Sequence, residues 1–151
     1  MVVMTQACDL EHDKVENVVL CPHLALDRHK IAWQAALRAM QQTPTEKAWR
    51  RYCGDIAEGL VWNLAMLNHQ LESQITMTHR IVDFHEVFTL PRIFLESLLT
   101  QRGKPRLRLM PPYREHLSQA FARFFMRVGL PVDVAKVWCP TPTDQSPAAS
   151  G

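Results

Sequence analysis

The residues best suited to chemistry lie near the start of the sequence, in the stretch VVMTQACDLEHDK. Val2 to Thr5 form a short apolar run typical of a buried strand, and the polar turn that follows contains a thiol and a carboxylate, Cys8 and Asp9. A thiolate is a nucleophile, and a carboxylate can act as a base or bind a ligand. Cys8 and Asp9 are therefore the candidate catalytic residues of the sequence.

Two structural interpretations of this pair stay open. Asp9 and Glu11 place negative charge beside Cys8, which disfavours a thiolate, although His12 offsets part of this effect. Cys8 can instead be a small apolar side chain packed where the strand ends. Asp9 can bond the backbone of its own turn. Both interpretations make the thiol of Cys8 less important than Asp9 and the turn that contains it.

The same region offers four side chains of the types that zinc prefers, namely Cys8, His12, Cys21 and His23. Their spacings match no familiar zinc finger, and adjacent residues of a strand point to opposite faces. We therefore predict no metal site and no cofactor. The four cysteines of the chain include no CxxC pair, which favours reduced thiols over a disulfide framework.

Positive charge is concentrated between Gln101 and Arg127, although the formal net charge of the chain is only +2. That stretch holds seven of the 17 basic residues and one of the 15 acidic residues, so ten basic and fourteen acidic residues lie elsewhere. Such asymmetry predicts a polyanionic partner, RNA or DNA. The alternative that stays open is a solvated face whose charge is balanced by acids elsewhere in the fold.

Four arginines of this stretch are the candidate nucleic-acid-binding residues. Arg106 and Arg108 are expected to project together from a short strand, KPRLRLM. Arg123 and Arg127 are expected on one stripe of the last helix, because they are spaced by one helical turn. No known RNA- or DNA-binding motif accompanies them. The aromatic residues of that helix are assigned to the core, which leaves no stacking platform that the sequence identifies.

The elements that must position these residues follow from apolar periodicity. Strands are predicted over residues 2–5, 15–26, 60–67, 79–90 and 104–110, and helices over residues 27–42, 44–56, 92–100 and 113–128. Asp27 is the expected N-cap of the first helix, and Thr43 with Glu46 forms the expected capping box of the second. Residues 2–5 and 15–26 are joined by a short polar link and are predicted to pair as an antiparallel hairpin.

Length and composition favour one globular domain. The chain has 151 residues, with 47% hydrophobic and 21% charged residues, which is ordinary globular composition. We predict a domain over residues 1–139, with a helical insertion at about 27–59, and a disordered tail over 140–151 that is rich in Pro, Ser and Ala. No apolar run approaches the ~18 residues of a membrane span, and no signal peptide is recognised, so a cytoplasmic location is expected.

Two segments resemble a known group of proteins. VVMTQACDLEHDKVENVVLCP resembles the strand–TQ-x-CDL–strand opening of a family of small, largely uncharacterised bacterial proteins. LRLMPPYREHLSQAFARFFMRVGLP resembles the closing helix of the same family. More distantly, the order of elements is similar to the SH3-like barrel of the PemK/MazF toxin ribonucleases, with IVDFHEVFTLPRIFLESL resembling a later strand and helix. The leading strand and basic residue of those toxins have no counterpart here, so no functional residue is carried over.

The expected fold is α+β. A small, strongly curved antiparallel sheet, an incomplete SH3-like barrel, would carry an inserted helical pair and a C-terminal amphipathic helix. An incomplete barrel leaves a strand edge exposed, and so a homodimer or a partner protein is expected to cover it. The function expected is an accessory nucleic-acid- or protein-binding module of a bacterial defence, mobile-element or toxin-like locus. The alternative is a nuclease centred on Cys8 and Asp9.

Overall fold

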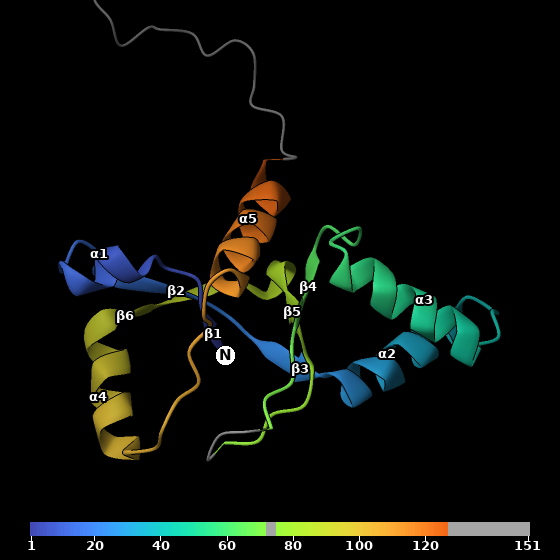
Figure 1. Cartoon of the computed structure of the whole chain (residues 1–151), viewed down its shortest axis with the longest axis horizontal. Helices are drawn as coiled ribbons and strands as arrows, with labels where there is room; N and C mark the ends of the chain where they lie inside the picture. The colour runs from blue at the N-terminus through green and yellow to red at the C-terminus, as the bar shows by residue number, and fades with distance from the viewer. Residues whose placement is uncertain (72–74, 127–151) are drawn as a thin grey trace, which may run out of the picture.

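The computed structural model describes residues 1–71 and 75–126 of the chain (Figure 1). Within those residues it contains five α-helices, one 3-10 helix and six strands, which form two separate three-stranded antiparallel sheets. The predicted α+β class is confirmed. The two sheets do not close into a barrel in the part of the chain that is described.

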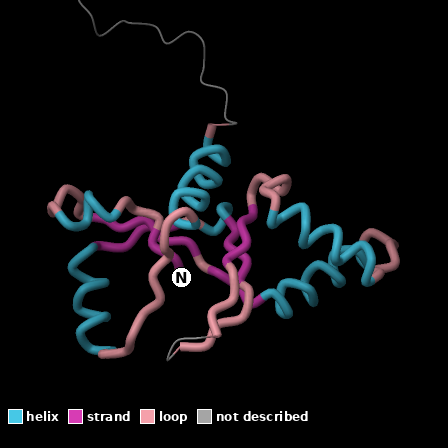
Figure 2. Tube along the Cα trace, in the orientation of Figure 1, coloured by secondary structure: helices cyan, strands magenta, loops and turns pink. Residues whose placement is uncertain are grey.

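The elements follow one another in an order that alternates short strands with helices (Figure 2). The strands are β1 (Val2–Val3), β2 (Asn17–Cys21), β3 (His23–Ala25), β4 (Leu64–Leu67), β5 (Arg80–Asp83) and β6 (Phe88–Pro91). The helices are α1 (Ala7–Glu11), α2 (Leu26–Ala39), α3 (Glu46–Ala57), the 3-10 helix η1 (Phe84–Glu86), α4 (Arg92–Arg102) and α5 (Tyr113–Phe125).

The centre of the fold is a two-stranded antiparallel ribbon. Each of its two segments is interrupted, and the two interruptions lie opposite each other. β2 pairs with β6, and β3 pairs with β5, so that the segment 17–25 runs antiparallel to the segment 80–91. The interruption falls at Pro22 in one segment and at η1 in the other, because proline has no N–H to donate to the ladder. The thiol of Cys21 bridges the gap by donating to the backbone carbonyl of Asp83, at 2.9 Å. The single strands predicted over 15–26 and 79–90 were therefore wrong, since each is divided between two sheets.

One further strand completes each sheet. β1 is antiparallel to β2, with Val2 opposite Cys21, which confirms the predicted pairing of these two segments. The link between them was predicted as a polar turn, but it contains the helix α1. β4 is antiparallel to β5, and it begins only at Leu64, later than the strand predicted from Leu60.

Two helices, α2 and α3, lie between β3 and β4, in the range where a helical pair was predicted. Rings from both helices pack together, with the centroids of Trp33 and Trp49 5.2 Å apart. The predicted caps were wrong. The N-cap of α3 is Thr45, whose side chain accepts from the backbone N–H of Ala48 at 3.2 Å, and Asp27 lies inside the first turn of α2.

The sheet β3-β5-β4 packs on both of its faces, because successive residues of β5 point to opposite sides. Val82 joins a buried cluster with Phe84 and with Leu117 of α5. Ile81 joins a second buried cluster with Ile56 of α3. The helical pair and α5 therefore lie on opposite faces of this sheet, as Figure 1 shows, and the segment that joins α3 to β4 passes close to α5.

The segment between α4 and α5 has no regular structure. The strand predicted over 104–110 is absent, because these residues are largely exposed and no neighbouring strand pairs with them. Leu109 is the exception, since it packs against the cluster around Val82. α5 ends at Phe125, and the rest of the helix predicted to residue 128, the predicted domain limit at 139 and the predicted tail lie outside the described residues. None of the helices described here has the length and apolar character needed to cross a membrane.

Candidate functional site

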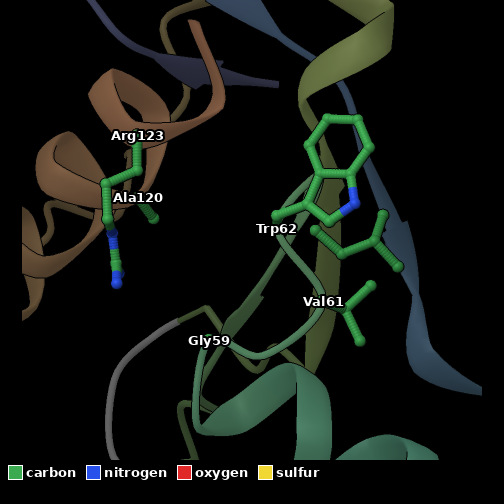
Figure 3. Close-up of a pocket in the computed structure, with 6 residues that line it drawn as sticks. Gly59, Val61, Trp62, Ala120 and Arg123 are labelled. Atoms are coloured by element: carbon green, nitrogen blue, oxygen red, sulfur yellow. The ribbon is translucent and has the colours of Figure 1, made fainter. Parts of the chain in front are cut away.

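A cavity of about 270 Å³ lies between α5 and the segment that joins α3 to β4. We call it the Trp62 site. Figure 3 shows Arg123 on α5 at one wall and Trp62 on the opposite wall. The lining residues are Gly59, Val61, Trp62, Leu64, Ala120 and Arg123. Apolar walls with a single cationic group are typical of small-ligand sites.

Gly59 explains the sharp turn of the chain beside this cavity. Gly59 has a φ of +72°, a left-handed conformation that glycine adopts without strain, and it turns the chain sharply after α3. The guanidinium of Arg123 lies over this turn. A Cβ atom at position 59 would be 3.5 Å from Nη2 of Arg123, so a larger side chain would fill the space beside the cation.

Arg123 has no carboxylate partner among the residues that the structure describes. Its position in the last turn of α5 is favourable for a cation, because the C-terminal end of a helix carries partial negative charge. The side chain is exposed and faces the cavity (Figure 3). A guanidinium in this setting can donate to a phosphate or stack on an aromatic base.

Three rings extend the Trp62 site beyond the cavity. The indole of Trp62 is stacked on the ring of Phe124, with centroids 5.3 Å apart and planes at 15°. The imidazole of His85 meets both rings edge-on, at 5.6 Å from Trp62 and 5.1 Å from Phe124. Trp62 keeps 45% of its surface exposed, so the stack presents a large aromatic surface to solvent.

His85 is oriented by two polar neighbours. Its Nδ1 lies 3.1 Å from Oδ1 of Asp83, and the same carboxylate oxygen accepts from the backbone N–H of His85 at 3.0 Å. Nδ2 of Asn63 is 3.4 Å from that oxygen and 3.3 Å from Nδ1 of His85. A carboxylate at Nδ1 favours the tautomer with the proton on that nitrogen, which leaves the lone pair on Nε2. Nε2 can then accept a proton or a hydrogen bond from a ligand.

The predicted catalytic pair lies elsewhere, on α1. Cys8 is exposed, and its thiol contacts Oε1 of Gln6 at 3.6 Å and Oδ1 of Asp9 at 3.9 Å. The backbone of Asp9 forms two hydrogen bonds at this turn: its N–H donates to the carbonyl of Gln6 at 3.2 Å, and its carbonyl accepts from the N–H of Lys14 at 2.9 Å. No cation touches either side chain in the described part of the chain.

The guanidinium nearest to α1 is already paired. Arg92 forms ion pairs with Asp13 and, at 3.2 Å, with Glu96, and it lies 3.5 Å from the carbonyl of Leu10. The hydrogen bond from Arg92 to Asp13 is the main reason that the pKa of Arg92 is raised above its usual value. An open hollow of about 470 Å³ beside this pair has acidic and apolar walls in addition to Arg92.

The four predicted arginines are not gathered into one surface. Arg106 and Arg108 are exposed on the irregular segment before α5, and neither forms an ion pair within the described residues. Arg123 lies in the last turn of α5, about 15 Å along that helix from its start at a rise of about 1.5 Å per residue. Arg127 lies outside the described residues.

Metal-binding geometry is absent from residues 1–71 and 75–126, where no group of three or more His, Cys, Asp or Glu side chains could hold an ion. The alternative zinc set Cys8, His12, Cys21 and His23 is therefore not brought together. Cys21 is fully buried, and burial, with the charges of Asp83 and Glu86, raises the pKa of its thiol to about 11. This thiol stays protonated at neutral pH, so it can donate the hydrogen bond to Asp83 that joins the two segments of the ribbon.

Sequence reasoning missed the Trp62 site. Trp62 was assigned to a strand, and Phe124 was assigned to the core, so their stack was not foreseen. Alternation along the strand predicted over 79–90 would put Asp83 and His85 on the same face. A glycine followed closely by a tryptophan at the start of a predicted strand, combined with that polar pair, is the signal that could have found the site.

Comparison of the chain with protein-family models, with curated proteins and with solved structures found no match. The resemblances to a bacterial family and to the PemK/MazF toxins therefore stay predictions from the sequence.

Proposed function

We propose that this protein binds single-stranded nucleic acid at the Trp62 site. The observation that carries the proposal is an exposed tryptophan beside a guanidinium that has no carboxylate partner among the described residues, on the two walls of one cavity. Proteins that bind single strands combine aromatic platforms for bases with cations for the phosphates. A duplex keeps its bases stacked inside, so it offers nothing to Trp62.

The size of the cavity supports the binding of one nucleotide unit. At about 270 Å³ it is smaller than most drug-sized ligand pockets, and one planar base suits it better than a larger molecule. Arg123 is placed to contact the phosphate of the same unit or to stack on its base. Arg106 and Arg108, which are exposed and have no ion pairs in the described part, add phosphate contacts along the strand.

The test is fluorescence anisotropy with short labelled single-stranded RNA and DNA, and with a duplex of the same sequence. Trp62→Ala is expected to weaken single-strand binding about tenfold or more, because stacking contributes roughly 1–3 kcal/mol per base. Trp62→Phe should recover most of the affinity. Arg123→Ala is expected to weaken binding severalfold. Arg38→Ala is the matched control, because it removes an exposed arginine from the last turn of α2.

The outcome that rejects the proposal is equal affinity of the protein and of Trp62→Ala for single strands. A combined change of Arg106, Arg108, Arg123 and Arg127 to Ala tests the charged part separately. It should lower the affinity and flatten its dependence on salt. Binding that is unaffected by this change would show that the basic residues form only a solvated face.

A second candidate function, a nuclease, is supported by one observation at the same site. Asp83 holds His85 with Nε2 free to accept a proton, which is the arrangement of a general base. This pair is a better candidate than Cys8 and Asp9, which have no cation or oriented base beside them in the described residues. The test is incubation of RNA and DNA with the protein and with His85→Ala. A cleavage activity that His85→Ala retains and Asp9→Ala abolishes would favour the sequence-based site.

The wider setting is part of the same proposal. We propose an accessory module of a bacterial defence, mobile-element or toxin-like locus, in which two small sheets in an open, SH3-like arrangement support α5 and the α3–β4 segment that form the ligand site. The outer strands of the two sheets leave edges that a second copy or a partner chain can cover. Light scattering of the purified protein tests this point, and a monomer at all concentrations would count against a homodimer.

A further inference from the structure

Two basic side chains lie on one face of the sheet β3-β5-β4, away from the Trp62 site. His23 is opposite Val82 in the pairing of β3 with β5. Arg80 lies two residues before Val82 on the same strand, so it shares the face of Val82 and is a diagonal neighbour of His23. Arg80 lies at the end of the sheet, where Leu67 and Ala25 flank it on the neighbouring strands.

Both side chains contain a buried polar atom without a partner. Nδ1 of His23 and Nε of Arg80 are shielded from solvent and have no hydrogen bond to any residue that the structure describes. Arg80 also forms no ion pair within the described residues. Burial lowers the pKa of His23, and the amino group of Met1 and the guanidinium of Arg80 lower it further. Positive charge is therefore gathered at this point without a compensating acid among the described residues.

Such an arrangement is incomplete as it stands. Buried polar groups are almost always hydrogen-bonded, and a buried cation is stable when an anion or several acceptors face it. The nearest acid in this part of the strand, Asp83, points to the other face, where it holds His85. The group that would complete the arrangement is an external anion.

We propose that Arg80 and His23 form a binding site for a phosphate group. The guanidinium offers a fork of parallel donors to two oxygens, and the imidazole offers a donor from a second strand to a third oxygen. Donors that come from two directions fit a tetrahedral oxyanion better than a planar carboxylate. Both residues are only half-buried, so a ligand can reach them from solvent. The site uses none of the residues of the Trp62 site and does not depend on the function proposed there.

The first test is thermal unfolding of the whole chain in inorganic phosphate and in sodium chloride of equal ionic strength. Phosphate should raise the melting temperature of the protein, and the rise should be lost in Arg80→Ala. Arg28→Ala is the matched control, because it removes an exposed arginine from the first turn of α2. Equal melting temperatures of the unchanged protein in both salts would overturn the proposal.

A second measurement guards against a variant that fails to fold. The ring resonances of His23 are followed by NMR against pH, with and without phosphate, in the unchanged protein. A bound phosphate should raise the pKa of His23, because the anion stabilises the imidazolium. His23→Gln, which retains a donor, should bind phosphate at least severalfold more weakly. An unchanged titration of His23 would also overturn the proposal.

Two sources of the phosphate are distinguished by oligonucleotides with a 5′-phosphate or a 5′-hydroxyl. A site for the end of a strand predicts tighter binding of the phosphorylated form, and Arg80→Ala should remove that difference. A site for free phosphate predicts equal binding of both forms, together with the thermal effect of inorganic phosphate. Loss of oligonucleotide binding in Trp62→Ala with the thermal effect retained would separate this site from the Trp62 site.

Discussion

Arg92 and Arg123 show how differently one residue type is used in two regions of this molecule. Arg92 lies in the first turn of α4, and its guanidinium forms ion pairs with Asp13 and Glu96. Arg123 lies in the last turn of α5 and has no carboxylate partner among the described residues. Arg92 connects α4 to the segment after α1, whereas Arg123 faces a cavity with an exposed tryptophan across from it.

The difference shows that a ligand site is recognised by a cation that lacks a carboxylate partner, and not by the number of charged residues nearby. The region around Arg92 contains the predicted residues Cys8 and Asp9, but its cation is already neutralised. The region around Arg123 contains none of the predicted catalytic residues, yet its cation has no carboxylate partner among the described residues. A ligand gains most where the protein has left donors unpaired.

The largest expected effect concerns the core on which both regions depend. Phe84 is fully buried between the two sheets, with its ring 5.5 Å from that of Phe121. Phe84→Ala is expected to lower the free energy of unfolding by about 3–5 kcal/mol, measured by urea denaturation. Phe88→Ala is the control, because Phe88 is 38% exposed on β6 and should have a much smaller effect. Equal effects of the two changes would contradict the placement of the core.

The next prediction contrasts the two thiols Cys8 and Cys21 in alkaline solution. Burial raises the pKa of Cys21 from 9.0 to about 11, so the folded state keeps the proton after the unfolded state has lost it. This contribution to stability is complete below pH 9 and is lost as the pH rises toward 11, at roughly 1.4 kcal/mol per pH unit. Cys21→Ala should flatten this part of the stability profile.

A thiol-alkylating reagent gives the matching chemical readout. Exposed Cys8 should react rapidly at pH 8, and Cys21 should react only when the protein unfolds. Mass spectrometry of the digested protein distinguishes the two sites. Rapid labelling of Cys21 in the folded protein would contradict its role in the interior of the ribbon.

The sequence predicted the helical insertion, the pairing of β1 with β2 and the helix over residues 92–100, because each depends on local periodicity. It did not predict the interruption of the central ribbon. Pro22 interrupts one segment because proline cannot donate to the ladder, but the matching interruption at η1 is set by the pairing of two distant segments. The segment 104–110 has strand-like alternation and is not a strand, since alternation cannot supply a neighbouring strand with which to pair.

The candidate site was the less predictable part. Arg123 was selected because it belongs to a basic stretch, and that choice did not depend on what faces it. Trp62 and Phe124 are distant in sequence, and only the packing of α5 against the α3–β4 segment brings their rings together. Pairing of Arg92 with Asp13 is equally non-local, so the sequence alone could not distinguish Arg92, which has a carboxylate partner, from Arg123, which has none among the described residues.

The third prediction separates Arg92 from Arg123 by the salt dependence of nucleic-acid binding. Each phosphate contact contributes about one unit to the slope of the logarithm of affinity against the logarithm of salt concentration. Arg123→Ala should reduce this slope by about one unit, and Arg92→Ala should leave it unchanged. Anisotropy titrations at several salt concentrations measure both slopes. Equal reductions in the two variants would remove the distinction between the two regions.

The smallest expected effect tests the ion pair of Arg92 itself. Asp13 has a φ of +54°, and asparagine tolerates this left-handed conformation well, so Asp13→Asn removes the charge without disturbing the backbone. The pair is exposed to solvent, and its loss should lower the melting temperature only slightly, by an amount that disappears at high salt. Arg92→Ala in the Asp13→Asn background should add little, because the two changes remove the same interaction. A large and salt-independent loss of melting temperature would mean that Arg92 holds the segment after α1 through its hydrogen bond to the carbonyl of Leu10 and not through the ion pair.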